Sequence, residues 1–261
     1  MKVSIMYEIC AISDTGKVRK HNEDCLLVMG QVKRESLHIG HAEMPFLLAV
    51  ADGVGGADKG EVASLMALSR LAEFQEFHDF PALSAHITGM NRELCAFARK
   101  NPGHSGMGTT LAGVICLERR IHPFHAGDSR VYRFRDGFLR QLTTDHTLVQ
   151  SLYAAGKISR DEMATHPNKN VIVKVLGGNC ERPPDPEVDE AGLEFRSGDI
   201  LLVCSDGLSD MASLDEMEEI LGRDDSLSTM TRSLIQAANA HGGEDNVTVV
   251  LCAEKKCHTG S

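Results

Sequence analysis

Acidic residues occur where apolar segments of the sequence begin or end. An Asp-Gly pair after a strand is often only a turn, so a single occurrence says little. In an antiparallel sheet the end of one strand lies beside the start of its neighbour. Several such sites with consistent strand directions therefore predict that the acids gather at one sheet edge. The acids and the apolar runs that they flank are Glu23 and Asp24 before 25–29, Asp52 after 46–51, Asp128 after 121–126, Asp206 after 200–204, and Asp245 before 247–252.

A carboxylate cluster of this kind would repel itself unless a cation neutralised it. Ligands that are all oxygen atoms favour Mg²⁺ or Mn²⁺ over zinc. Gly53, which follows Asp52, would let its own carbonyl approach a metal closely. Two such ions about 3.5–4 Å apart activate a bridging water for in-line attack on phosphorus. Arg19 lies four residues before Glu23. It is compatible with an ordinary surface arginine, but beside a metal cluster its guanidinium could hold a phosphate with two hydrogen bonds.

The elements that must position these acids are short. The runs 46–51, 110–117, 200–204 and 247–252 predict buried strands, and Asp136-Gly137 between 131–135 and 138–142 predicts a tight hairpin. Helical patterns cover about 60–77, 82–99 and 227–240. Strand clusters separated by helices, without strict alternation, predict an α+β fold in which helices pack on an antiparallel sandwich. We expect one domain over 1–254 with an inserted segment at about 147–176, and a frayed tail at 255–261.

Composition excludes several function classes. The net charge is −10, from 27 Lys+Arg and 37 Asp+Glu, and aromatic residues are 5% with no Trp. These values argue against binding to nucleic acid or to an anionic membrane. No apolar run approaches the roughly 20 residues of a membrane span, and the first ten residues do not resemble a signal peptide. We therefore expect a cytoplasmic protein.

The cysteines and histidines give no zinc signature. The eight cysteines contain no CxxC pair, which predicts buried, reduced thiols. The pairs His38/His41 and His122/His125 lack the further ligands of a structural zinc site.

Six short motifs follow one another along the chain. They are Ser13–Gly16 with Arg19–Asp24, Ala51–Gly56 with Gly60–Ser64, Gly106–Thr110, Gly127–Arg130 with Leu142–His146, Cys204–Leu208, and Asp245–Thr248. In order and spacing these motifs resemble those of the type 2C, metal-dependent serine/threonine protein phosphatases (the PPM family). The resemblance covers about residues 8–253 and is strongest to the compact bacterial subgroup.

This resemblance implies a central β-sandwich of two antiparallel sheets flanked by helices on both sides, in α-β-β-α layers, with a metal cleft at one edge. It implies that a hydroxide bridging two Mn²⁺ or Mg²⁺ ions attacks the phosphorus of phospho-Ser or phospho-Thr. The segment 147–176 would be a flap that contacts the protein substrate. The implied site roles are Asp52 bridging both ions, Asp206 and Asp245 on the first ion, Glu23 and the Gly53 carbonyl on the second, Asp128 on a third, Asp24 supporting the ligands from behind, and Arg19 on the substrate phosphate.

One departure from the family pattern concerns the proton donor. Many members carry a histidine two residues after the bridging Asp, or a little later, and these positions are Val54 and Ala57 here. We expect His21 to be structural, which leaves a metal-bound water as the default donor.

Two other functions stay open at this point. One is a hydrolase of small phosphate esters that uses the same site. The other is a phosphatase-like binding module, which would have lost metal ligands. The expected partners are phosphorylated proteins and a bacterial Ser/Thr kinase that shares these targets, and we expect a monomer.

Overall fold

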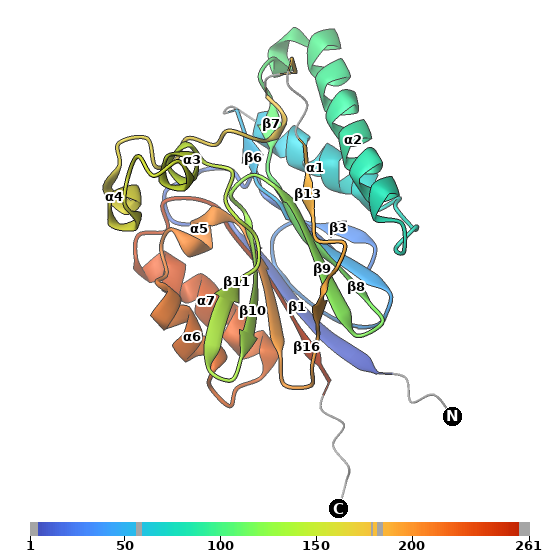
Figure 1. Ribbon diagram of the computed structural model, residues 1–261, viewed down its shortest axis with the longest axis vertical. Coiled ribbons are helices and arrows are strands. Elements are labelled where there is room, and N and C mark those ends of the chain that lie inside the picture. The colour runs from blue at the N-terminus through green and yellow to red at the C-terminus, as the bar shows by residue number, and fades with distance from the viewer. Residues whose placement is uncertain (1–4, 56–58, 179, 182–184, 256–261) are drawn as a thin grey trace, which may run out of the picture.

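The structure is a computed structural model that describes residues 5–55, 59–178, 180–181 and 185–255. Two antiparallel sheets lie face to face at its centre (Figure 1). The first sheet has the strand order β11-β10-β15-β16-β1-β4. Its strands are β1 (Met6–Asp14), β4 (Leu37–Glu43), β10 (Arg130–Arg135), β11 (Phe138–Gln141), β15 (Ile200–Cys204) and β16 (Val247–Glu254).

The second sheet has the order β13-β9-β8-β5-β2-β3, and β14 also pairs with β9. A small third sheet has the order β12-β7-β6. The strands of the second sheet are β2 (Cys25–Val28), β3 (Gln31–Lys33), β5 (Phe46–Ala51), β8 (Leu111–Leu117), β9 (Arg120–Ala126), β13 (Glu187–Val188) and β14 (Leu193–Glu194). Those of the small sheet are β6 (Gly53–Val54), β7 (Gly108–Thr109) and β12 (Leu176–Gly177).

Helices cover the outer face of each large sheet. α1 (Lys59–Leu71) and α2 (Phe80–Lys100) pack on the second sheet, where Leu68 and Ile87 share one apolar core with Leu111. α5 (Asp206–Ser209), α6 (Leu214–Leu221) and α7 (Leu227–Ala240) share another core with the first sheet. A third core fills the space between the two sheets. The four layers confirm the predicted α-β-β-α sandwich.

Local sequence signals explain most element boundaries. The side chain of Asp79 accepts a hydrogen bond from the Ala82 amide at the start of α2, as an N-cap does. Asp136 and Gly137 have φ angles of 53° and 86°, the left-handed conformations that a two-residue hairpin requires. The helix expected at 60–77 ends at Leu71 instead. Phe74, at 5% exposure, continues the apolar pattern but lies in the turn between α1 and α2, against Phe77.

The segment predicted as a flap contains α3 (Leu148–Ala154) and α4 (Arg160–Thr165). Its two ends are joined: Thr147 forms a β-bridge with Ile172, and the Leu148 amide donates to the Val171 carbonyl over 2.8 Å. The segment therefore leaves and re-enters the sandwich at one place, and its two helices lie outside the sheets (Figure 1).

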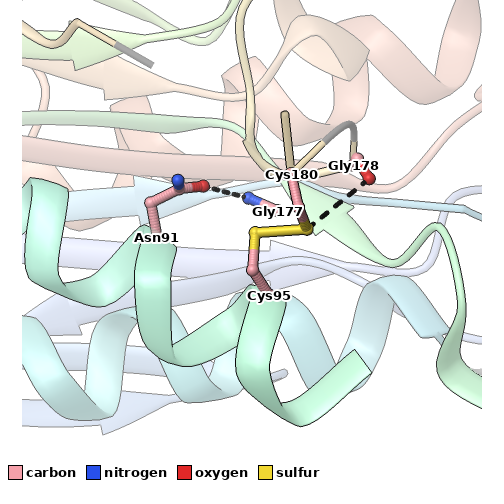
Figure 2. Close-up of a disulfide and its surroundings, with 5 residues drawn as sticks. All are labelled: Asn91, Cys95, Gly177, Gly178 and Cys180. Atoms are coloured by element: carbon pink, nitrogen blue, oxygen red, sulfur yellow. Dashed lines mark hydrogen bonds between the residues drawn. A yellow bond between two sulfur atoms is a disulfide. The ribbon is translucent and has the colours of Figure 1, made fainter. Parts of the chain in front are cut away.

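The expectation that all cysteines are reduced thiols is wrong for one pair. Cys95 on α2 and Cys180 form a disulfide (Figure 2). One helical turn earlier, the Asn91 side chain accepts a 2.7 Å hydrogen bond from the Gly177 amide. The two links attach the chain that leaves the flap to α2. The two cysteines are 85 positions apart in the sequence, so no local pattern indicated that they are neighbours in space. Cys10, Cys25, Cys116, Cys204 and Cys252 are buried free thiols as expected.

Parts of two other expectations lie outside the described residues. Of the tail at 255–261 only Lys255 is described, and its amide donates to the Met6 carbonyl. Ala57 is not described. No helix in the described part of the chain is long and apolar enough to cross a membrane.

Candidate active site

Strand pairing brings the predicted acids to one edge of the sandwich. In the second sheet Cys25 at the start of β2 pairs with Ala51 at the end of β5, so Asp24 and Asp52 are neighbours. In the first sheet the end of β15 lies beside the start of β16, because the Ser205 amide donates to the Thr248 carbonyl. This pairing places Asp206 near Asp245. The strand directions that the sequence predicted are those of the structure.

The carbonyl of Asp52 is fixed by two threonines at the end of β7, Thr109 in the strand and Thr110 directly after it. It accepts hydrogen bonds from the Thr109 hydroxyl (2.9 Å) and the Thr110 amide (2.8 Å), and the Thr110 hydroxyl accepts one from the Asp52 amide. Gly53 packs directly against Gly60 in the first turn of α1. A Cβ at Gly53 would lie 2.2 Å from the Gly60 carbonyl oxygen, so only glycine fits there.

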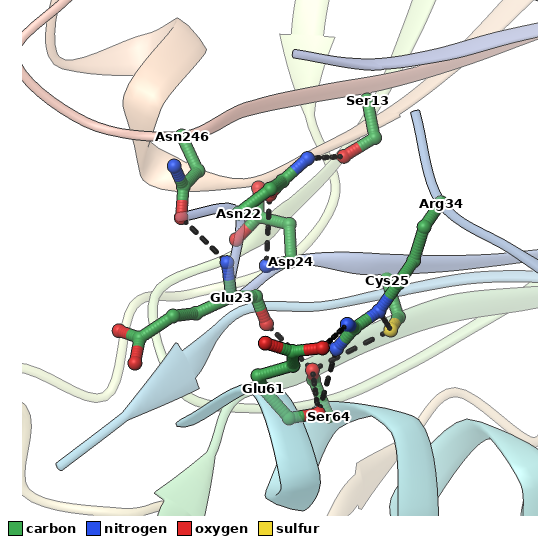
Figure 3. Close-up of polar contacts among 9 residues, drawn as sticks. All are labelled: Ser13, Asn22, Glu23, Asp24, Cys25, Arg34, Glu61, Ser64 and Asn246. Carbon is green, nitrogen blue, oxygen red and sulfur yellow. Dashed lines mark hydrogen bonds and ion pairs between the residues drawn. The ribbon is translucent and has the colours of Figure 1, made fainter. Parts of the chain in front are cut away.

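Glu23 is held at the edge through its main chain (Figure 3). Its amide donates to the Asn246 side chain (2.8 Å), and its carbonyl accepts from the Ser64 hydroxyl (2.5 Å). The Asn246 amide group also donates to the Thr15 and His21 carbonyls. One side chain from the start of β16 therefore organises the loop that carries Arg19 and Glu23.

Asp24 lies behind the edge and is fully buried. One of its carboxyl oxygens accepts hydrogen bonds from Thr248 (2.6 Å) and Ser205 (2.8 Å), which join the two sheets. Burial raises its pKa to about 7, although these hydrogen bonds lower it. Asp24 thus links β2 to β15 and β16 directly behind the other acids of the edge.

The electrostatics of the edge are those of an uncompensated anionic cluster. Burial, aggravated by the neighbouring carboxylates, raises the pKa of Asp128 to about 8 and that of Asp206 to about 6. The pKa of Asp52 is raised well above its usual value by burial and by Asp24, Asp206, Asp128 and Asp245. A cation bound among these carboxylates would favour their ionised forms.

The chemistry of this cluster fits divalent cations. Among the described residues, one oxygen each of Asp24, Asp128 and Asp206 is buried and has no hydrogen-bond partner. Buried oxygens of this kind are costly unless they are bonded or coordinated. The donors at the edge are carboxylates and a glycine carbonyl, which suit Mg²⁺ or Mn²⁺.

Arg19 lies at the rim of the cluster. Its guanidinium contacts the Asp245 carboxylate at 2.7 Å, and about half of its side chain is exposed. It therefore reaches the predicted metal ligands while it stays accessible to an incoming phosphate. Val54 pairs with Gly108 and offers no titratable group. His21 is exposed, and its main-chain carbonyl accepts a hydrogen bond from the Asn246 side chain.

A groove of about 870 Å³ opens from the carboxylate edge. It is lined by Asp128 and Asp206 and by residues of the flap, of the β10–β11 hairpin and of α6. Arg130, which pairs with Asp145 at 2.6 Å, also lines the groove. Sequence reasoning missed Asp210, which lines the groove and whose pKa is raised by burial. Its spacing of four residues from Asp206, on the same helical turn, is the signal that could have revealed it.

Comparison with known proteins agrees with this architecture. The sequence profile of the family "Protein phosphatase 2C" matches residues 27–251. The chain is 36% identical over 249 residues to the serine/threonine phosphatase stp of Listeria innocua, and the match covers 92% of each protein. It is 38% identical over 256 residues to the serine/threonine protein phosphatase PstP of Mycobacterium tuberculosis, which covers 96% of this chain and 45% of PstP.

Solved structures show the same fold. The crystal structure of the M. tuberculosis phosphatase PstP/Ppp superposes with a TM-score of 0.81 at 35% identity, covering 97% of this chain and all of that one. The PstP catalytic domain in complex with two manganese ions superposes with a TM-score of 0.77 at 35% identity, covering 96% of this chain and all of that one. The sandwich is thus that of a serine/threonine protein phosphatase. The chain belongs to the protein phosphatase 2C family of bacterial serine/threonine protein phosphatases.

Proposed function

We propose that this protein removes phosphate from phosphoserine and phosphothreonine in proteins, using two Mn²⁺ or Mg²⁺ ions and a third, weaker ion at its carboxylate edge. The single observation that supports this most strongly is the set of buried, unpartnered carboxylate oxygens on Asp24, Asp128 and Asp206. In the family to which the chain belongs, a structure with two manganese ions is known. When bound, such ions supply Lewis acidity and lower the pKa of a water nucleophile.

Each residue at the edge has a proposed role. Asp24 orients the surrounding chain through Ser205 and Thr248, and Arg19 holds the substrate phosphate with two hydrogen bonds. The ions would be held by Asp52 between both, by Asp206 and Asp245 on the first, by Glu23 and the Gly53 carbonyl on the second, and by Asp128 on the third.

Substrate selection is proposed to reside in the flap at 147–176. Residues of the flap and of the β10–β11 hairpin line the same groove as Asp128 and Asp206, and a phosphorylated segment would bind there. We further propose a cytoplasmic, monomeric enzyme with one catalytic domain over 1–254, whose substrates are the targets of a bacterial Ser/Thr kinase.

The test compares one phosphothreonine-containing protein with p-nitrophenyl phosphate, in Mn²⁺ and in EDTA. We expect hydrolysis of both in Mn²⁺, none in EDTA, and a loss of about 10³-fold or more in kcat for Asp52→Asn with an unchanged far-UV spectrum. Hydrolysis of small esters alone would instead support the small-ester hydrolase. Full activity in EDTA would contradict the proposal.

A further inference from the structure

His146 makes contacts that the function proposed above does not use. It is 7% exposed and lies directly before the flap. Its amide donates to the Gly127 carbonyl over 2.9 Å, and the Gly127 amide donates back to its ring Nδ1 over 3.1 Å. Its carbonyl accepts a 2.8 Å hydrogen bond from Val173, at the other end of the flap. One residue thus holds both ends of the flap region and both polar groups of Gly127.

Gly127 directly precedes Asp128, and this turn has little freedom. Gly127 has a φ of +128°, and a Cβ there would lie 2.7 Å from the side chain of Thr110. Ser129, which follows Asp128, shares a 2.7 Å hydrogen bond with the Thr110 hydroxyl, which also accepts from the Asp52 amide. The turn 127–129 is therefore held by Thr110 on one side and by His146 on the other.

The remaining ring nitrogen of His146 faces Glu187 on β13, at 2.7 Å. Because Nδ1 accepts from the Gly127 amide, Nε2 carries the proton and donates to Glu187. The ring is also stacked on His125, at 4.4 Å between centroids. Lys174 lies 3.5 Å from the same Glu187 carboxylate. The orientation of the ring is therefore fixed from both ends.

His125, His146 and Glu187 lie close enough together to suggest a metal site. The hydrogen bonds argue against one. His125 Nε2 lies 2.7 Å from the Thr144 carbonyl, which can only accept, so this nitrogen carries a proton. His146 Nε2 is protonated for the reason given above. Neither of these two nitrogens offers a lone pair to an ion, and the contacts that join the three residues are ring stacking and a hydrogen bond.

We propose that His146 is a positioning residue that couples the flap to the third metal position, because its ring and main chain hold the Gly127–Asp128 turn in register with both ends of the flap. Movement of the flap then alters the placement of the Asp128 carboxylate, and an ion at Asp128 in turn favours one flap position. Supporting groups outside a metal shell commonly change metal affinity by about 10–100-fold. This inference rests on the proposed third ion at Asp128.

Two substitutions distinguish the contributions of the two ring nitrogens of His146. In His146→Asn the side-chain oxygen can replace Nδ1 and accept from Gly127, whereas the contact with Glu187 is lost. In His146→Gln the side-chain amide can replace Nε2 and reach Glu187, whereas the acceptor for Gly127 is lost. Both variants are neutral and similar in size. A structural role alone predicts similar effects for the two.

The experiment titrates Mn²⁺ into the full chain by calorimetry and measures KM and kcat for a phosphothreonine peptide. Asp128→Ala is the reference without the third site. We expect His146→Gln to weaken the third binding event about tenfold or more and to raise KM for the peptide. His146→Asn should stay within about threefold of the wild type in metal affinity.

The two failures are distinguishable. If Asp128→Ala binds as many ions as the wild type, the proposal that Asp128 holds a third ion is wrong. If Asp128→Ala loses one ion while His146→Gln keeps wild-type affinity for it, the coupling through His146 is wrong. Equal weakening by His146→Gln and His146→Asn, with equal loss of melting temperature, would also overturn it, since that result assigns His146 to folding only.

Discussion

Replacement of Asp128 by asparagine should stabilise the metal-free protein. Asp128 is 7% exposed, and burial among other carboxylates raises its pKa from 3.8 to about 8. Because the folded state binds this proton more tightly than the unfolded state, the contribution of Asp128 to stability is full below about pH 4. It falls as the pH rises through about 8. Each pKa unit is worth about 1.4 kcal/mol, so at pH 7 the burial of Asp128 lowers the free energy of unfolding by about 4 kcal/mol relative to acidic pH.

The assay is thermal unfolding in EDTA at pH 7.5 and at pH 4.5. Asparagine keeps the shape of the side chain and removes the charge, so Asp128→Asn should melt up to about 10 °C higher at pH 7.5, with little gain at pH 4.5. Asp225→Asn, at an exposed position, makes the same charge change and should have almost no effect. With saturating Mn²⁺ the wild type should have the higher melting temperature, because Asp128→Asn lacks a metal ligand. An unchanged or lower melting temperature for Asp128→Asn in EDTA at pH 7.5 would refute the electrostatic reasoning.

Three further predictions test other parts of the molecule. Arg19→Ala should raise KM for a phosphopeptide about tenfold and leave Mn²⁺ affinity nearly unchanged. Arg19→Lys should restore KM only in part, because lysine cannot donate two parallel hydrogen bonds to the phosphate. An unchanged KM would show that Arg19 does not bind the substrate. Lys157→Ala and Arg160→Ala, both at exposed flap positions, should change kcat/KM severalfold for phosphoproteins and leave kcat/KM for p-nitrophenyl phosphate unchanged. Equal effects on both substrates would show that the flap does not select substrates. Reduction with dithiothreitol should lower the melting temperature of the wild type but not of Cys95→Ser. A disulfide between residues 85 positions apart stabilises the fold by up to about 4–5 kcal/mol. If reduction has no effect on the wild type, Cys95 and Cys180 are not linked in solution.

Much of the fold was predictable because strands and turns carry local signals. The run 46–51 forms β5 with the expected bounds, and Asp136-Gly137 forms the expected hairpin turn. The direction of each strand, together with the acid at its end, was enough to predict that the carboxylates share one edge. The roles assigned to Glu23, Asp52 and the other ligands came from resemblance, and they stay predictions.

The features that sequence reasoning missed depend on contacts between distant segments. Phe74 fits a helical pattern, yet its burial at the α1–α2 corner requires the helix to end before it. Cys95 and Cys180 meet only because β12 pairs with β7 beside α2. His146 was noted only as part of a motif, since its contacts with Gly127 and Glu187 come from separate parts of the chain.

The most direct test of the central claim counts the ions that the carboxylate edge binds. Equilibrium dialysis of the metal-free protein against Mn²⁺ should give at least two bound ions per chain. Asp52→Asn, which removes the carboxylate proposed to lie between them, should bind at least one ion fewer and keep its far-UV spectrum. If Asp52→Asn binds as many ions with the same affinity as the wild type, the metal centre lies elsewhere, and the account of this edge as the catalytic site is wrong.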